Sequence, residues 1–218
     1  MKLQCSTYSL FGGNMGITER RQMEKETQKK KIVNAASEIL VSEGYEKLSI
    51  RKIANKIEYS PGIIYHYFKD KGEVVAAVIE EGYTKIIETL SGIPIDTENP
   101  ERTIENSLRA YINLMLSMPQ QFRAVLMNDL ETNQEKTNML QQGVSKDRKS
   151  ISGLCRLLEL GIEKGKFRSL EVELTAQIFW TSTYGLISRL ILEKNISDQQ
   201  RERLINQHFE ILIRGLGI

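Results

Sequence analysis

The densest group of side chains that can bind a polyanion lies between residues 60 and 71. Tyr65 and Tyr67 carry hydroxyls that donate hydrogen bonds, and Lys69 and Lys71 carry ammonium groups. Hydroxyls, ammonium groups and free backbone amides are the groups that bind phosphate oxygens in nucleic-acid complexes. The segment therefore predicts contact with phosphates, and the apolar residues between these donors predict that one side of it is buried.

Positive charge is concentrated around this segment. The whole chain carries a formal net charge of +2, whereas residues 29–71 contain nine basic and five acidic side chains. The net charge of this stretch, nine minus five or +4, exceeds that of the whole chain, so the remainder is net acidic. Local charge of this kind favours a polyanionic partner.

Three predicted helices would position these side chains. Apolar residues recur at helical spacing over about residues 26–43, with Thr27 as a candidate N-cap. Ser49 is a good N-cap for a second helix through Lys56. Pro61 suits the first turn of a third helix that ends near Tyr67, because that position has no hydrogen bond to lose. A supporting helix followed by two short helices around a tight turn is a helix-turn-helix arrangement.

The rest of the chain shows the same helical spacing. Further helices are predicted over about 71–90, 100–118, 119–133, 134–164, 171–192 and 197–216. The expected fold class is all-α, with about nine helices in total. The expected domains are a flexible tail over 1–22, a helix-turn-helix domain over 23–72 with its motif at about 49–68, and a larger helical domain for ligand binding and dimerisation over 73–218.

The segments Ser49-Ile50-Arg51-Lys52-Ile53-Ala54 and Ser60 to Lys71 together resemble the N-terminal signature of TetR-family transcription regulators. Gly44-Tyr45 resembles the end of the family's first helix, and the resemblance extends over about residues 27–78. The rest of the chain is similar to the family in helix number and length. One position differs, because family members often carry glycine in the turn where this chain has Glu58. We therefore expect either backbone strain at Glu58 or a slightly different turn.

The resemblance implies that the third helix enters the major groove of double-stranded operator DNA. Gly62 would allow close backbone approach, and Ile63 would contact a thymine methyl group. Ile64 and Phe68 are expected in the core, whereas His66 is left open between DNA contact and ordinary surface packing. The candidate DNA-binding residues are Thr27, Ser49, Arg51, Ser60, Pro61, Gly62, Ile63, Tyr65, His66, Tyr67, Lys69 and Lys71.

Aromatic and methionine side chains on the later helices form a second candidate group. Cavities between helices are common ligand sites, and thioethers adapt to irregular space. Few charges interrupt these stretches, so together with the resemblance they imply a small hydrophobic effector. An ordinary core position is the alternative for each residue taken singly. The candidate effector-binding residues are Tyr83, Tyr111, Met115, Phe122, Leu126, Phe179, Trp180, Thr183 and Tyr184.

The last two predicted helices are long and amphipathic, with apolar residues such as Ile178, Leu204 and Phe209. In TetR-family proteins the last two helices form a four-helix interface with the partner subunit, so the resemblance implies a homodimer. Two-fold symmetry would then place two recognition helices about 34–36 Å apart, which is one turn of DNA. Packing within one subunit alone is the alternative.

Other functional classes have little support in the sequence. No GxGxxG, P-loop, GxSxG or HExxH pattern is present, so we do not expect an enzyme. Two cysteines and two histidines fit no metal-site spacing, so no metal or cofactor is expected, and we expect a cytoplasmic protein without a membrane segment. The main prediction is a repressor that a hydrophobic ligand releases from its operator. The alternative is a helix-turn-helix protein without such a ligand, controlled by protein partners or acting architecturally.

Overall fold

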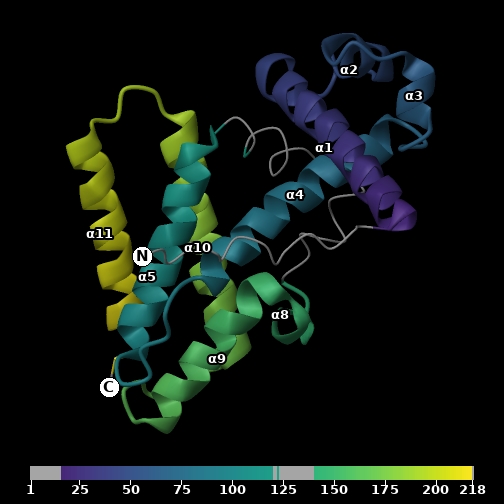
Figure 1. Cartoon of the computed structure of the whole chain (residues 1–218). Coiled ribbons are helices and arrows are strands. Elements are labelled where there is room, and N and C mark those ends of the chain that lie inside the picture. Colours follow the sequence, from purple (N-terminus) through teal and green to yellow (C-terminus); the bar gives the residue numbers. More distant parts are fainter. Residues whose placement is uncertain (1–15, 120–121, 123–139, 218) are drawn as a thin grey trace, which may run out of the picture.

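The computed structural model describes residues 16–119, 122 and 140–217. All regular structure within these residues is helical (Figure 1). The helices are α1 (Ile17–Glu43), α2 (Ile50–Lys56), α3 (Pro61–Tyr65), α4 (Lys71–Ser91), α5 (Pro100–Ser117), α8 (Val144–Asp147), α9 (Lys149–Glu163), α10 (Val172–Leu192) and α11 (Asp198–Arg214).

The first three helices and the start of α4 share one hydrophobic core. Ile32 and Ile39 of α1 pack there with Ile53 of α2 and Ile64 of α3. The short helices begin where the sequence predicts, because the Ser49 side chain accepts a hydrogen bond from the Lys52 amide at 3.2 Å and Pro61 occupies the first turn of α3. This core holds the helix-turn-helix in place.

A second core lies among α5, α9, α10 and α11. These helices contact one another, with α10 packed against α5, α9 and α11 (Figure 1). The core contains Tyr111 and Ile112 of α5, Leu158 of α9 and Ile187 of α10. The cluster also includes Phe167, whose ring occupies the space that a side chain at Gly161 would need.

Helix α4 joins the two cores. Its first turns place Val74, Val75 and Val78 in the N-terminal core, whereas Ile86 belongs to the second core. The same helix contacts α1, α5 and α9. A displacement of α4 would therefore change the packing of both cores.

The start of the first helix differs from the expectation. Helix α1 begins at Ile17, so the tail expected over 1–22 is wrong for residues 17–22, which are helical. The Gly16 amide donates to Glu19 Oε2 at 3.0 Å and fixes this earlier start. Thr27 is consequently not an N-cap, because it lies inside α1 and its hydroxyl donates to the Met23 carbonyl at 2.8 Å.

The prediction of one continuous helix over 134–164 is also wrong, because α8 and α9 are separate helices. Gly143 has φ +84°, and Arg148 is extended between α8 and α9. A left-handed glycine and an extended residue both interrupt helical hydrogen bonding. Most of the helix expected over 119–133 lies outside the described residues. Within the described part of the chain, no helix combines the length and apolar character that crossing a membrane requires.

Candidate nucleic-acid interface

The turn between α2 and α3 is closed by backbone hydrogen bonds around a left-handed residue. Glu58 has φ +59°, the left-handed conformation that glycine adopts most easily. The Tyr59 amide donates to the Ala54 carbonyl at 2.8 Å, and the Glu58 amide donates to Asn55 at 3.3 Å. This is the Schellman pattern, in which glycine is the usual left-handed residue. The chain thus keeps the turn of a helix-turn-helix with a glutamate in the glycine position.

The segment from Ser60 to Phe68 has some side chains in the core and others in solvent. Ile64 and Phe68 are buried, as expected, whereas Ile63 and Tyr65 expose 38% and 57% of their surface. Ser60, Pro61, Gly62 and His66 are exposed as well. The structure therefore places six of the candidate DNA-binding residues on one accessible, firmly anchored segment. Helix α3 itself ends at Tyr65, two residues earlier than predicted.

The residues that follow α3 are less available than expected. Tyr67 is half-buried against the N-terminal core, and Lys69 is exposed. Lys71 Nζ donates to the Tyr45 carbonyl at 2.7 Å and lies 3.7 Å from the centre of the Tyr45 ring. Lys71 therefore ties the start of α4 to the end of α1, and a phosphate contact would require it to leave Tyr45.

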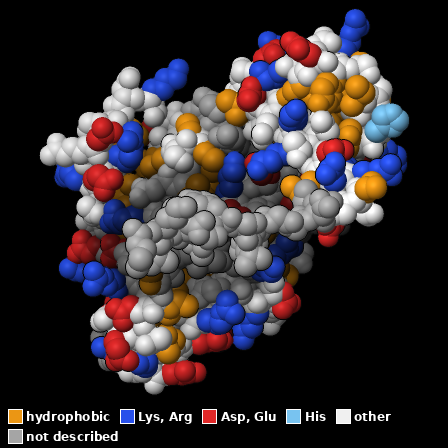
Figure 2. Space-filling model, in the orientation of Figure 1, with side chains coloured by type: hydrophobic (Ala, Val, Ile, Leu, Met, Phe, Trp, Pro, Cys, Tyr) orange, Lys and Arg blue, Asp and Glu red, His pale blue; other side chains and the backbone are white. Residues whose placement is uncertain are grey.

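Charge on α2 is partly neutralised inside the domain. Lys52 pairs with Glu43, and the hydrogen bond from Lys52 holds the pKa of the Glu43 carboxyl below its usual value. Lys56 similarly pairs with Glu38 at 2.9 Å. Arg51 is exposed, which leaves it as the basic side chain of α2 most accessible to a phosphate. Figure 2 shows basic side chains spread around the surface of this domain, between apolar and acidic ones.

The effector candidates of the second domain are packed against each other. The rings of Tyr111 and Trp180 stack at 4.6 Å between centroids, and those of Phe122 and Tyr184 lie 5.3 Å apart. Tyr111 exposes only 1% of its surface, and its burial raises the pKa of its hydroxyl. The sequence predicted this grouping, and the structure shows these rings in direct contact with each other. We call Tyr111, Phe122, Trp180 and Tyr184 the aromatic core.

The other effector candidates surround the aromatic core. Met115 and Phe179 are buried, and Thr183 donates a hydrogen bond to the Phe179 carbonyl at 2.7 Å. The Thr183 hydroxyl also lies 2.9 Å from His208 Nε2. Tyr83 is half-buried on α4 and donates to Ser150 Oγ at 3.0 Å. Leu126 lies outside the described residues.

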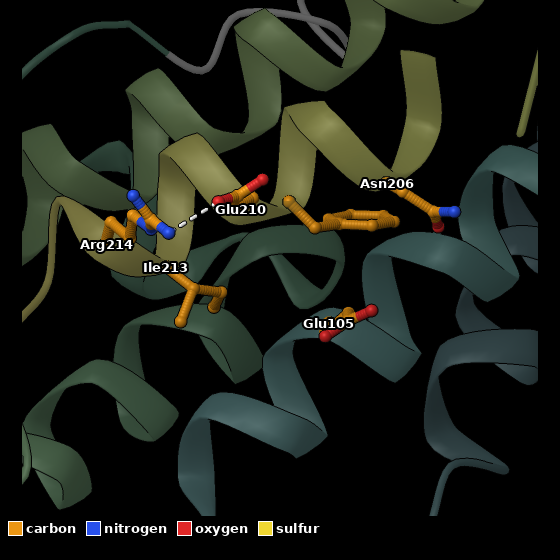
Figure 3. Close-up of a pocket in the computed structure, with 6 residues that line it drawn as sticks. Glu105, Asn206, Glu210, Ile213 and Arg214 are labelled. Carbon is orange, nitrogen blue, oxygen red and sulfur yellow. Dashed lines mark ion pairs between the residues drawn. The ribbon is translucent and has the colours of Figure 1, made fainter. Parts of the chain in front are cut away.

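A surface pocket between α5 and α11 was not predicted from the sequence. Its volume is about 340 Å³, and Glu105 of α5 faces Asn206, Glu210 and Arg214 of α11 across it (Figure 3). Its floor includes Phe209, which is 2% exposed. The pocket arises from two helices about a hundred residues apart, so no local motif marks it.

The last two helices each carry exposed apolar side chains. Leu174, Ile178 and Leu192 are exposed on α10, and Leu204 and Ile211 on α11. These residues recur at helical spacing, so on each helix they lie on one side. Phe209, in contrast, belongs to the core, so its expected place in a subunit interface is wrong.

Comparison with known proteins agrees with this architecture. Residues 32–78 match the model for bacterial regulatory proteins of the tetR family. The fatty acid metabolism regulator protein of Bacillus subtilis is 24% identical over 88% of this chain and 97% of its own length. The regulator QacR of Staphylococcus aureus is 23% identical over 87% of this chain and 98% of its own.

Solved structures share the fold. The fatty acid degradation regulator FadR from Bacillus halodurans matches with a TM-score of 0.69 at 20% identity, covering 85% of this chain and 94% of that one. A putative fatty acid metabolism regulator from Clostridium perfringens matches with a TM-score of 0.64 at 22% identity, covering 86% and 99%. Residues 32–78, which hold the helix-turn-helix, thus match the bacterial regulatory proteins of the tetR family, and the chain as a whole shares the fold of these solved regulators.

Proposed function

We propose that this protein is a repressor that binds operator DNA through α3 and is released from it by a small hydrophobic molecule. The exposure of α3 carries this proposal. A helix of five residues is not stable alone. Here Ile64 and Phe68 anchor it, and Ile63 and Tyr65 project into solvent. Such a short, rigidly held helix with an apolar and a hydroxyl-bearing side chain suits base and phosphate contacts in a major groove.

The working form in this proposal is a homodimer through α10 and α11. Leu174, Ile178 and Ile211 are more than half exposed, although isoleucine and leucine are among the most often buried residue types. A second copy of the same two helices would cover these side chains in a two-fold symmetric interface. Two α3 helices would then reach successive major grooves on one side of the DNA.

The effector class follows from the aromatic core and the relatives together. The regulators from Bacillus subtilis, Bacillus halodurans and Clostridium perfringens are named for fatty acid metabolism or degradation. The aromatic core and the buried Met115 and Phe179 offer an apolar, adaptable environment to an acyl chain. Thr183 and His208 would supply polar groups at its edge. A fatty acid or its thioester is therefore the proposed effector.

Helix α4 would carry the signal between the two domains. Because it takes part in both cores, a ligand that separates α5 from α10 would also shift the first turns of α4. Lys71 connects those turns to Tyr45 at the end of α1. A small rotation of α4 would then change the spacing of the two α3 helices in the dimer. A ligand releases DNA only as far as it prefers the non-binding spacing.

Selection of an operator tests the proposal. The purified full chain would be used to enrich binding sites from randomised duplexes, and fluorescence anisotropy would then follow binding of the selected site. We expect a two-fold symmetric sequence with half-sites one turn apart. Saturated fatty acids and their coenzyme A thioesters should release it, whereas alkanes of the same length, which lack the polar end, should be weaker.

Two results would contradict the proposal. Absence of any enriched sequence would reject specific DNA binding. An operator whose affinity responds to no acyl compound, with no compound raising the melting temperature, would favour the alternative of a DNA-binding protein without a small-molecule ligand.

A further inference from the structure

The first half of α1 is a helix without a hydrophobic core of its own. Helix α1 has 27 residues, and its first buried side chain is Ile32. Residues 17–31, which we call the arm, are all exposed or half-buried. At about 1.5 Å per residue, the arm is roughly 22 Å long. The purple start of α1 extends beyond α2 and α3 in Figure 1.

The arm is rich in unpaired positive charge. It carries six basic side chains and three acidic ones. Glu19 accepts a hydrogen bond from the Gly16 amide, and Glu26 accepts one from the Gln22 side chain at 2.9 Å. Within the described part of the chain, no basic side chain of the arm forms an ion pair. The basic side chains are Arg20, Arg21, Lys25, Lys29, Lys30 and Lys31.

Helical spacing separates these charges onto different sides of the arm. Arg21, Lys25 and Gln28 lie on the side of α1 that is buried from Ile32 onward. Glu19 and Lys30 lie on the opposite side. The side that faces the domain is thus apolar where the domain covers it and basic where the helix extends past the domain's edge.

One hydrogen bond places the arm relative to α3. The Tyr59 hydroxyl donates to Gln28 Oε1, and Tyr59 immediately precedes Ser60, the N-cap of α3. In helix-turn-helix proteins the N-terminal residues of the recognition helix contact base edges. Gln28 therefore lies beside the DNA-reading end of α3, and Arg21 and Lys25 continue outward from that point.

We propose that the arm binds the phosphate backbone of duplex DNA outside the half-site contacted by α3. The proposal rests on the proposed function, because α3 must bring the DNA to this surface. The cationic side of the arm complements phosphates and is continuous with the α3 face. From Gln28 to Ile17 the arm spans about 16 Å, so at 3.4 Å per base pair it reaches roughly five base pairs. Each subunit would extend the bound site by that length.

Paired variants and paired duplexes test the arm. The full chain, Lys25→Gln and Arg21→Gln/Lys25→Gln are titrated with the selected operator, once trimmed to its half-sites and once extended by a further helical turn on each side. Lys30→Gln is the matched control, since it removes the same charge from the opposite side of the helix. All positions are exposed, so circular dichroism should show unchanged folding.

The salt dependence of binding gives the expected result. Each lost phosphate contact lowers the slope of log affinity against log salt by about 0.9, and a dimer loses two contacts per substitution. On the extended duplex Lys25→Gln should lower the slope by about two, and the double variant by about three to four. On the trimmed duplex the variants should match the wild-type protein, and Lys30→Gln should match it on both.

Three other outcomes would reject either DNA binding by the arm or the proposed function as a whole. If an operator is selected but wild-type protein and both variants show equal salt slopes on the extended duplex, DNA binding by the arm is rejected and the proposed function is not. Variants that lose the dimer in sedimentation show that the arm contacts protein, which also overturns it. A wild-type protein that binds no duplex rejects the proposed function and the arm together.

Discussion

The two domains present their candidate functional side chains in opposite ways. In the N-terminal domain Tyr65 and Ile63 point into solvent from a helix that Ile64 holds in place. In the second domain Tyr111 and Trp180 are stacked inside the core. A DNA-reading surface can be ready before its partner arrives, because the partner is a large external surface. The proposed small apolar effector would share space with the core that stabilises the domain, so in this proposal binding and folding depend on the same residues.

Substitutions in the proposed subunit interface should have the largest effect on operator affinity. Ile178→Glu with Ile211→Glu would place two carboxylates on the exposed apolar sides of α10 and α11. We expect monomers in analytical ultracentrifugation and a loss of operator affinity of about a thousandfold, since one half-site alone approaches non-specific binding. Ile95→Glu, an equally exposed isoleucine outside these helices, is the control. A double variant that stays dimeric would move the interface elsewhere.

Truncation of the aromatic core should have the next largest effect. Tyr111→Ala removes a fully buried ring stacked on Trp180. The expected loss is about 3–5 kcal/mol in the free energy of unfolding, as for other large aromatic truncations. Urea denaturation measures it. A loss below about 1 kcal/mol would mean that the core is already loose enough to admit an effector unaided.

The matching truncation on α3 should separate binding from stability. Tyr65→Ala removes a ring that is 57% exposed. The free energy of unfolding should change by less than about 0.5 kcal/mol. Operator affinity should fall by about 1–3 kcal/mol, measured by anisotropy at fixed salt. A variant that is destabilised but binds normally would assign Tyr65 a packing role.

Backbone strain offers a smaller test in both domains. Glu58 and Asn195 both have positive φ, at +59° and +69°. Glycine relieves a left-handed strain of about 1–2 kcal/mol but makes the unfolded chain more flexible. Glu58→Gly should therefore stabilise the protein by about 0.5–1 kcal/mol. Asn195→Gly should gain less, because asparagine tolerates this conformation better. Equal thermal shifts in the two variants would argue against strain at Glu58.

Protonation of His208 should produce the smallest effect. Burial lowers the pKa of His208 below its usual value. The unfolded chain then binds a proton more readily, so stability is complete above pH of about 6.5 and is lost as the pH falls through the lower, folded pKa. His208→Gln should flatten the change in unfolding free energy between about pH 7 and 5. An unchanged pH profile would exclude His208 as the titrating group.

The sequence predicted most of the N-terminal domain because its signals are local. Ser49 and Pro61 stand directly before apolar residues at helical spacing, which is a local signal for a helix start. Glu58 stands where family members often carry glycine, and it has the positive φ of that turn. The start of α1 was missed because Thr27 is as good a local cap as the Gly16 amide with Glu19.

Other features depended on tertiary contacts that spacing does not encode. Phe209 and Ile211 are both apolar residues of α11, yet the packing of α11 on α5 and α10 leaves Phe209 buried and Ile211 exposed. Lys71 has the charge of a phosphate ligand, but its place beside the Tyr45 carbonyl follows from the packing of α4 on α1. The aromatic core was recognised as a group, whereas the pairing of its rings was not predictable from side-chain types.

In the proposed mechanism an effector in the second domain and operator DNA at α3 oppose each other through α4. Isothermal titration of an acyl ligand into the free dimer and into the operator-bound dimer measures this directly. We expect the ligand to bind the DNA-bound form about 5- to 150-fold more weakly, by the same factor with which it weakens operator affinity. Equal ligand affinity in the two titrations would contradict the claim, and tighter binding on DNA would reverse its sign.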